Sequence, residues 1–173
     1  MKIRNLGMLL GLLTLSGSIV GCGPTGIKRL SPVEWNHYKA LRVYMNDDIR
    51  EVYLDQDTEV DRNQFLHDAG LWDRYYQYPE YVRAEIIAGD VALGWTKDKL
   101  LMSWGRPQDR GRVAGRQARI SERWIYRFEQ HTNGTLRIWE PGSSTSYHAA
   151  RLFQRVVLMD DDIVVDITDS DDW

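Results

Sequence analysis

The chain has 173 residues, one cysteine and a formal net charge of −3 at pH 7, and 43% of its residues are hydrophobic. This length and composition allow one domain with a sizeable apolar core, and a single cysteine excludes an intrachain disulfide and a thiolate zinc site. Charge is distributed unevenly, since residues 97–155 hold 12 basic and five acidic residues, whereas residues 160–173 hold seven acidic and no basic ones. We therefore expect one basic and one acidic region on the molecule.

Residues 1–21 have the order of a secretory signal peptide. Two basic residues precede an apolar run from Leu6 to Leu13, and small residues follow as far as Gly21. The run is too short to cross a bilayer, which takes about 20 apolar residues. The sequence Val-Gly-Cys at its end resembles the lipobox of signal-peptidase-II substrates, which predicts cleavage after Gly21 and lipidation of Cys22. The alternative is a general secretory signal, with Cys22 as a free thiol.

Lipidation of Cys22 implies a protein of the cell envelope. Several acyl chains, each contributing about 0.8 kcal/mol per buried methylene, give a stable anchor where one chain is marginal. Gly23 stands where an inner-membrane retention signal usually has Asp. By resemblance to sorting signals, the expected location is the periplasmic face of the outer membrane, with residues 22–30 as a flexible tether.

Residues 31–88 are expected to be helical. Ser31, followed by Pro at the next position and Glu at the third, has the pattern of a capped helix start, and the helix is predicted to reach about Met45. Further helices are predicted at 49–54, 58–69 and 80–88, with an aromatic link at 71–78.

The pattern changes after residue 88. Thr96 is expected to cap a short helix that ends at Gly105, and an Arg/Gly-rich loop follows to about residue 120. The aromatic residues Trp124, Tyr126 and Phe128 then alternate with polar ones, which predicts a strand at 123–129 with one buried face.

Three more strands are expected near the C-terminus. Asn133 and Gly134 predict a hairpin leading into 135–140, and strands at 152–159 and 163–167 flank a turn at 160–162. Residues 169–173 are expected to be an acidic tail. Helices followed by strands predict an α+β fold, in which N-terminal helices pack on an antiparallel β-meander of three to four strands as a two-layer sandwich.

The stretch from Gly89 to Pro107, followed by Glu122-Arg-Trp-Ile-Tyr126, resembles the SmpA/OmlA-like outer-membrane lipoproteins, which include the small E subunit of the β-barrel assembly machinery. The resemblance implies two helices on a three-stranded sheet in residues 89–168, related to the β-lactamase-inhibitor-protein fold. Trp95 and Trp104 depart from the family pattern, and residues 31–88 are extra helical sequence. The chain therefore resembles a divergent member.

Five arginines in the Arg/Gly-rich segment are the candidate binding residues: Arg106, Arg110, Arg112, Arg116 and Arg119. Guanidinium groups form bidentate contacts with phosphates and carboxylates, so we expect a contact with anionic lipid or an acidic protein partner. The alternative is a soluble loop whose charge balances the acidic regions. Nucleic acid is a poor explanation for the basic part, because the signal sequence predicts export and the chain has no clustered Lys/Arg helix with a reading motif.

No catalytic or metal-binding set stands out in the sequence. The four histidines, His37, His67, His131 and His148, lack metal-ligand spacing. Residues 143–146 lack a nucleophile elbow, and the acidic pairs and trios lack the pattern of a calcium loop. We expect no enzyme activity, cofactor or metal. The predicted function is an envelope lipoprotein that presents an interaction domain and supports outer-membrane protein assembly or envelope integrity. The alternative is a periplasmic domain that inhibits an envelope hydrolase, and the oligomeric state stays open.

Overall fold

The computed structural model describes residues 26–140 and 149–171. The predicted cleavage site at Gly21, the lipidation site at Cys22 and the polar run at 143–146 lie outside the described residues, as does His148.

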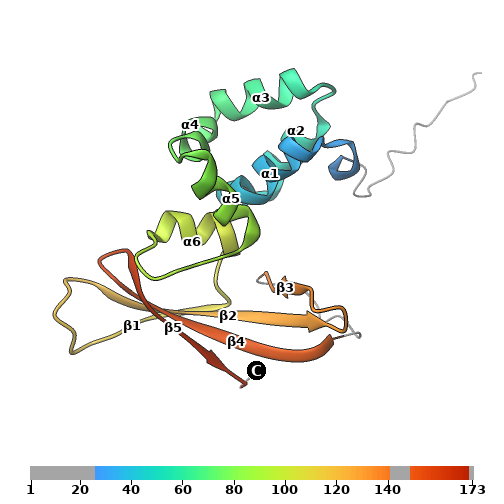
Figure 1. Cartoon of the computed structure of the whole chain (residues 1–173). Coiled ribbons are helices and arrows are strands. Elements are labelled where there is room, and N and C mark those ends of the chain that lie inside the picture. The colour runs from blue at the N-terminus through green and yellow to red at the C-terminus, as the bar shows by residue number, and fades with distance from the viewer. Residues whose placement is uncertain (1–25, 141–148, 172–173) are drawn as a thin grey trace, which may run out of the picture.

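In the described part of the chain, six α-helices form a layer on one face of an antiparallel sheet (Figure 1). Helix α6 lies across the sheet, and α1 to α5 stack on the side of α6 that is turned away from it. The helices are α1 (Pro32–Leu41), α2 (Asp47–Asp55), α3 (Glu59–Asp68), α4 (Leu71–Tyr76), α5 (Glu80–Ala88) and α6 (Lys97–Trp104), with short 3-10 turns η1 (Ile27–Arg29) and η2 (Arg42–Tyr44).

Side-chain caps explain where several helices begin. The Ser31 hydroxyl accepts a hydrogen bond from the Glu34 backbone N–H at 3.3 Å, and the Glu34 carboxylate accepts one from the Ser31 N–H at 2.7 Å. This reciprocal capping box was predicted and is confirmed. Thr58 caps α3 and Thr96 caps α6, each by accepting a hydrogen bond from the backbone N–H three residues later, also as predicted.

Helix α4 forms where the sequence predicted only an aromatic link. Gly70, with φ of 66°, ends α3 in the left-handed conformation and turns the chain directly into α4. Leu71 and Tyr75, four residues apart, are both buried on the inner side of this short helix. Six residues are too few to show a helical period, which explains the missed element.

Within residues 26–140 and 149–171 the sheet has five antiparallel strands: β1 (Asp109–Arg112), β2 (Ser121–His131), β3 (Leu136–Ile138), β4 (Ala149–Asp160) and β5 (Ile163–Ser170). Their order is β1-β2-β4-β5, and β3 pairs with β2 beyond the end of β1. The α+β class is confirmed. The strand count exceeds the expected three to four because β1 forms in a segment that was predicted to be a loop. In addition, β5 extends two residues into the predicted acidic tail.

The apolar core is continuous from the helices to the sheet. Trp124, Tyr126 and Phe128 are 2%, 0% and 2% exposed, so the predicted aromatic face of β2 is confirmed. The Trp104 ring of α6 packs edge-on against Tyr126 and Phe128, with centroids 5.2 and 5.1 Å apart. Its indole N–H donates to the Gly89 carbonyl at 2.9 Å, which joins α6 to the end of α5.

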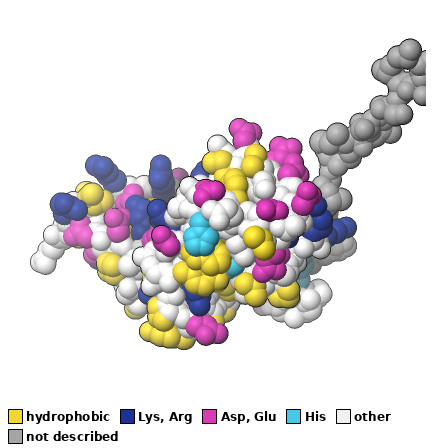
Figure 2. Space-filling view, turned by 90° about the horizontal axis from the view of Figure 1, so that it is seen from above, with side chains coloured by type: hydrophobic (Ala, Val, Ile, Leu, Met, Phe, Trp, Pro, Cys, Tyr) yellow, Lys and Arg dark blue, Asp and Glu magenta, His cyan; other side chains and the backbone are white. Residues whose placement is uncertain are grey.

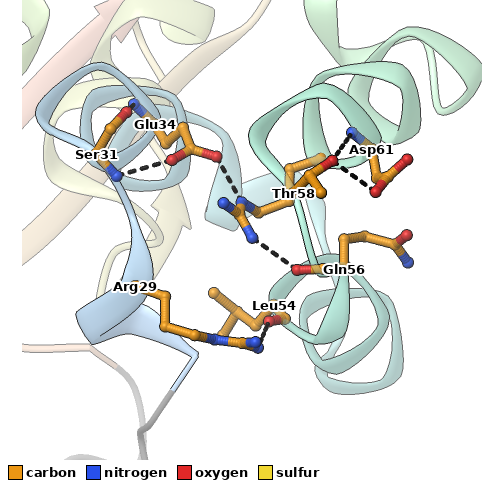
Figure 3. Close-up of polar contacts among 8 residues, drawn as sticks. Arg29, Ser31, Glu34, Leu54, Gln56, Thr58 and Asp61 are labelled. Carbon is orange, nitrogen blue, oxygen red and sulfur yellow. Dashed lines mark hydrogen bonds and ion pairs between the residues drawn. The ribbon is translucent and has the colours of Figure 1, made fainter.

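A buried ion pair holds the upper helices together (Figure 3). Glu34 of α1 and Arg62 of α3 are 1% and 4% exposed, and their charged atoms lie 2.5 Å apart. Arg62 also donates to the Gln56 carbonyl at 2.6 Å, in the turn between α2 and α3. Burial alone would raise the pKa of Glu34, but hydrogen bonds from Arg62 and the Ser31 N–H hold that pKa below its usual value. The pair therefore fixes α1 against α3 as a charged unit.

A basic cleft beside strand β1

A cleft of about 600 Å³ lies between η2, α6 and β1. Its apolar walls include Tyr44, Leu101 and Trp124, and its polar lining consists of Lys97, Arg106, Gln108, Asp109 and Arg110. Three of these five polar side chains are cationic, and one is acidic. We call this feature the basic cleft.

Strand register places two arginines on the helix side of the sheet, of which Arg110 lines the cleft and Arg112 follows two residues beyond it. Arg110 pairs with Trp124 and Arg112 with Glu122 across the β1–β2 ladder, so both side chains share the face of the buried aromatic residues. Both are exposed, and β1 is an edge strand of the sheet. Within the described residues, neither guanidinium has an ion-pair partner or a hydrogen-bond acceptor.

Arg106 adds a third positive charge without a counter-ion. Its guanidinium donates a hydrogen bond to the Val43 carbonyl at 3.2 Å, and no carboxylate among the described residues pairs with it. Lys97 differs, because its ammonium lies 2.7 Å from Glu122 and 3.0 Å from Asp162. Burial opposes the charge on Lys97, but the two carboxylates raise its pKa above the usual value. The uncompensated cations are therefore the arginines.

Two hydrogen-bond donors of the cleft lack acceptors. The indole Nε1 of Trp124 and the amide Nε2 of Gln108 are buried atoms with no partner among the described residues. Both residues line the cleft. An unsatisfied buried donor costs about 1–3 kcal/mol. Both atoms are shielded from solvent, so a ligand forms hydrogen bonds with them only after the wall of the cleft moves.

Arg116 and Arg119 lie elsewhere and have structural partners. Arg116 holds Asp160 through two nitrogens, with Nε–Oδ1 and Nη2–Oδ2 distances of 2.8 and 2.7 Å, and hydrogen bonds from Arg116 and Ser121 lower the pKa of Asp160. Arg119 lies 4.0 Å from Asp161. These contacts tie the β1–β2 connection to the β4–β5 turn. The expectation of one loop across all five arginines is therefore wrong, because Arg110 and Arg112 belong to a strand.

The charge distribution of the surface agrees with this division. Figure 2 looks onto the helical layer and shows Lys and Arg side chains gathered at the left end of the molecule, the end at which β1 lies in Figure 1. Acidic side chains spread over the helices. The separate acidic region expected from residues 160–173 is not formed, because these acids lie among the basic residues: Asp160 pairs with Arg116, Asp169 with Arg155 and Asp171 with Arg151.

His37 forms a second polar site, which the scattered histidines of the sequence did not indicate. It is 2% exposed on α1, and its Nε2 lies 2.8 Å from the Tyr76 hydroxyl, while its Nδ1 has no partner among the described residues. Trp72 and Tyr75 contact its ring edge-on. Burial lowers the pKa of His37 to about 4, so the ring is neutral at pH 7.

In the described ranges, 26–140 and 149–171, no three His, Cys, Asp or Glu side chains lie together as a metal-ligand set. None of the helices in these ranges has the length and apolar character needed to cross a bilayer.

Comparisons with protein-family models, with curated proteins and with solved structures gave no match. The resemblance to SmpA/OmlA-like lipoproteins therefore stays a prediction, carried by the residues from Gly89 to Tyr126.

Proposed function

We propose that this chain is a non-enzymatic lipoprotein of the cell envelope that binds an acidic protein partner through the basic cleft. The observation that carries the proposal is the set of three arginines, Arg106, Arg110 and Arg112, without carboxylate partners among the described residues, beside two buried donors without acceptors. A partner carboxylate forms bidentate hydrogen bonds with such a guanidinium and supplies the missing charge.

The anchor determines where this binding takes place. Lipidation at Cys22, after cleavage at Gly21, attaches the chain to a membrane. The tether is shorter than the expected 22–30, because Ile27–Arg29 form η1 and Arg29 donates to the Leu54 carbonyl at 2.8 Å. The absence of Asp after the cysteine favours the periplasmic face of the outer membrane. The resemblance to the β-barrel assembly subunit suggests the process that the partner serves, which is outer-membrane protein assembly or envelope integrity.

The cleft suits a protein side chain because it is not uniformly polar. Tyr44, Leu101 and Trp124 provide apolar surface next to the arginines. Rim charges mainly speed encounter and select partners of opposite charge, and their effect falls as salt rises. Binding is therefore expected to weaken with ionic strength while keeping a contribution from apolar burial.

The test uses two matched variants of the lipidated protein. Arg110→Glu reverses a charge at the cleft, and Arg123→Glu reverses an exposed charge on the opposite face of the same sheet. Chemical cross-linking in intact cells is expected to trap an envelope protein with the wild type and with Arg123→Glu, and to lose it with Arg110→Glu. Equal trapping by all three proteins would overturn the proposal.

A fractionation experiment tests the anchor separately. The wild type is expected in the outer-membrane fraction and Cys22→Ala in the soluble fraction. If the trapped partner is a hydrolase whose activity falls on binding, the inhibitor alternative replaces the assembly role.

A further inference from the structure

Strand β1 has a free edge next to the basic cleft. We infer that an extended acidic segment of the partner adds to this edge as a further antiparallel strand, with two acidic side chains opposite Arg110 and Arg112. The inference rests on the proposed function and specifies how the acidic partner binds.

The ladder determines which backbone groups of β1 point outward. Val113 donates to the Ser121 carbonyl at 2.9 Å, so this pair is a hydrogen-bonded pair of the antiparallel ladder. Such pairs alternate along two strands with pairs whose N–H and C=O groups point away from each other. Arg110 and Arg112 belong to the second kind, and their backbone groups therefore face the open side of β1. No strand of the described residues pairs there.

Side-chain spacing gives this edge its selectivity. Arg110 and Arg112 are two residues apart and lie on one face, and residues directly opposite each other on neighbouring strands also share a face. An added strand therefore meets both arginines when acidic residues stand at positions i and i+2. Asp109 lies on the other face of β1, which disfavours acidic residues at the alternate positions. The preferred segment alternates Glu or Asp with uncharged residues such as Val or Thr.

The opposite edge of the sheet is less open. The segment before α6 covers the start of β5, since Gly94 donates to the Val164 carbonyl and Val164 donates to the Trp95 carbonyl, each at 2.8 Å. The later part of β5 is acidic, with Asp166 and Asp169 three residues apart, and Asp169 already pairs with Arg155 at 2.9 Å. Asp171 follows two residues after Asp169, but it already pairs with Arg151, as Asp169 does with Arg155. Both carboxylates are engaged within the chain, which argues against a second copy of the chain as the occupant.

Charge on a short edge strand also protects it from wrong pairing. Two copies of β1 would bring arginines opposite arginines, and this repulsion disfavours self-association. The carboxylates of an acidic segment would instead attract the two guanidinium groups. The edge is therefore closed to copies of itself and open to an acidic strand.

The test uses the mature chain, residues 22–173 with Cys22→Ala, and synthetic nine-residue peptides measured by isothermal titration calorimetry. The parent peptide has two Glu residues separated by one Val, within an otherwise Thr and Val sequence. A second peptide of the same composition separates the Glu residues by two positions. Two further peptides carry N-methyl groups on alternate amides, one on each edge of the strand.

We expect the parent peptide to bind and the respaced peptide to bind about tenfold more weakly. One N-methylated peptide is expected to lose binding while the other keeps it, because only one strand edge faces β1. Arg110→Ala with Arg112→Ala is expected to weaken the parent peptide about tenfold, and Arg123→Ala to leave it unchanged.

The outcomes separate the inference from the proposed function. If respaced and N-methylated peptides bind as well as the parent, strand addition is overturned, while binding of an acidic partner stands. If size-exclusion chromatography shows oligomers that dissociate on Arg110→Glu, a second copy occupies the edge and the inference is overturned. If no peptide binds and cross-linking in cells is also insensitive to Arg110→Glu, the proposed function fails with it.

Discussion

His37 shows how burial alone sets the chemistry of a single residue. Its ring lies among Trp72, Tyr75 and Tyr76, and its exposed fraction is 2%. Protonation would place a charge in this apolar surrounding, with the Arg83 guanidinium 4.4 Å from the Tyr76 ring centroid as a further repulsive charge. The nearby Glu34 favours the charged ring, but its carboxylate is already paired with Arg62. The folded protein therefore holds His37 neutral.

This gives the folded state a defined dependence on pH. The pKa of His37 falls from 6.5 to about 4 on folding, so between these values the unfolded chain binds a proton that the folded chain rejects. Stability is complete above pH 6.5 and decreases as the pH falls toward 4, by up to about 3 kcal/mol. Urea unfolding at pH 7 and pH 5 measures the loss. His37→Gln keeps a hydrogen-bonding group without titrating, and an unchanged slope in that variant would contradict the assignment.

At the residue scale, local signals were predictable and long-range ones were not. Ser31, Thr58 and Thr96 cap helices through contacts three residues away, which a single sequence contains. The partner of Glu34 lies 28 positions along the chain, and nothing in the sequence links the two. The missing hydrogen-bond acceptor of the Trp124 indole N–H could not be predicted from the sequence either. The alternation of aromatic residues predicts a buried ring, but it does not indicate whether its N–H has an acceptor.

At the element scale, the connection between β1 and β2 is held by the turn between β4 and β5. The Arg116 guanidinium donates hydrogen bonds to the Asp160 carboxylate, and the backbone N–H groups of Arg119 and Ile120 donate to the Asp161 carboxylate at 3.3 and 3.0 Å. The turn residues Asp161 and Asp162 have φ values of 46° and 66°, as a two-residue hairpin turn requires. The acidic residues 160–162, which the sequence predicted to form a turn, therefore also hold the connection between β1 and β2 through hydrogen bonds and an ion pair.

Removing the contacts of Asp160 and Asp161 should make the connection between β1 and β2 more accessible to proteases. Asp160→Ala with Asp161→Gly deletes both carboxylates, and Gly tolerates the positive φ of the second position. Trypsin is expected to cut the variant after Arg116 and Arg119 several-fold faster than the wild type, because the segment can open locally without the cost of breaking these contacts. Mass spectrometry identifies the cut. Asp169→Ala removes an exposed ion pair elsewhere and should leave the rate unchanged, and equal rates in all three proteins would disprove this role of Asp160 and Asp161.

Elements with a clear period were predictable, and those without one were not. Helices α3, α5 and α6 and strand β2 lie where caps, glycines and alternating aromatic residues placed them. Strand β1 consists of Asp, Arg, Gly and Arg and has no apolar alternation, because it is an edge strand with both faces partly solvated. Its existence depends on pairing with β2, a tertiary contact that overrides its weak propensity. The candidate site was therefore predicted by composition but not by geometry.

At the scale of the whole molecule, the helical region 31–88 and the later α+β region share one core. A single cluster of buried residues runs from Tyr38 through Trp104 to Val164. Polar contacts cross the same boundary: the Arg42 guanidinium pairs with the Glu140 carboxylate at 2.6 Å, and Arg106 donates to the Val43 carbonyl. The basic cleft lies on this boundary, so its shape depends on both regions.

Asp98 is the centre of that boundary. Its carboxylate accepts from the Tyr44 hydroxyl and from Arg74, both at 2.6 Å, and from the Tyr78 hydroxyl at 3.3 Å, which links η2, α4 and the segment before α5 to α6. Burial and the hydrogen bond to Asp98 raise the pKa of Tyr44 well above its usual value, so the hydroxyl stays a donor.

We therefore expect the chain to unfold as one unit. Tryptophan fluorescence and far-UV circular dichroism should give coincident urea transitions, because neither region buries its apolar face alone. Asp98→Ala is expected to lower the free energy of unfolding by about 1–3 kcal/mol while the transitions stay coincident, since it leaves the Tyr44 hydroxyl without its acceptor. Asp169→Ala, which removes an exposed pair, should cost less than about 1 kcal/mol. Two separated transitions in the wild type would instead show that the helical region is an independent domain, and the cleft between them would then open and close with their relative motion.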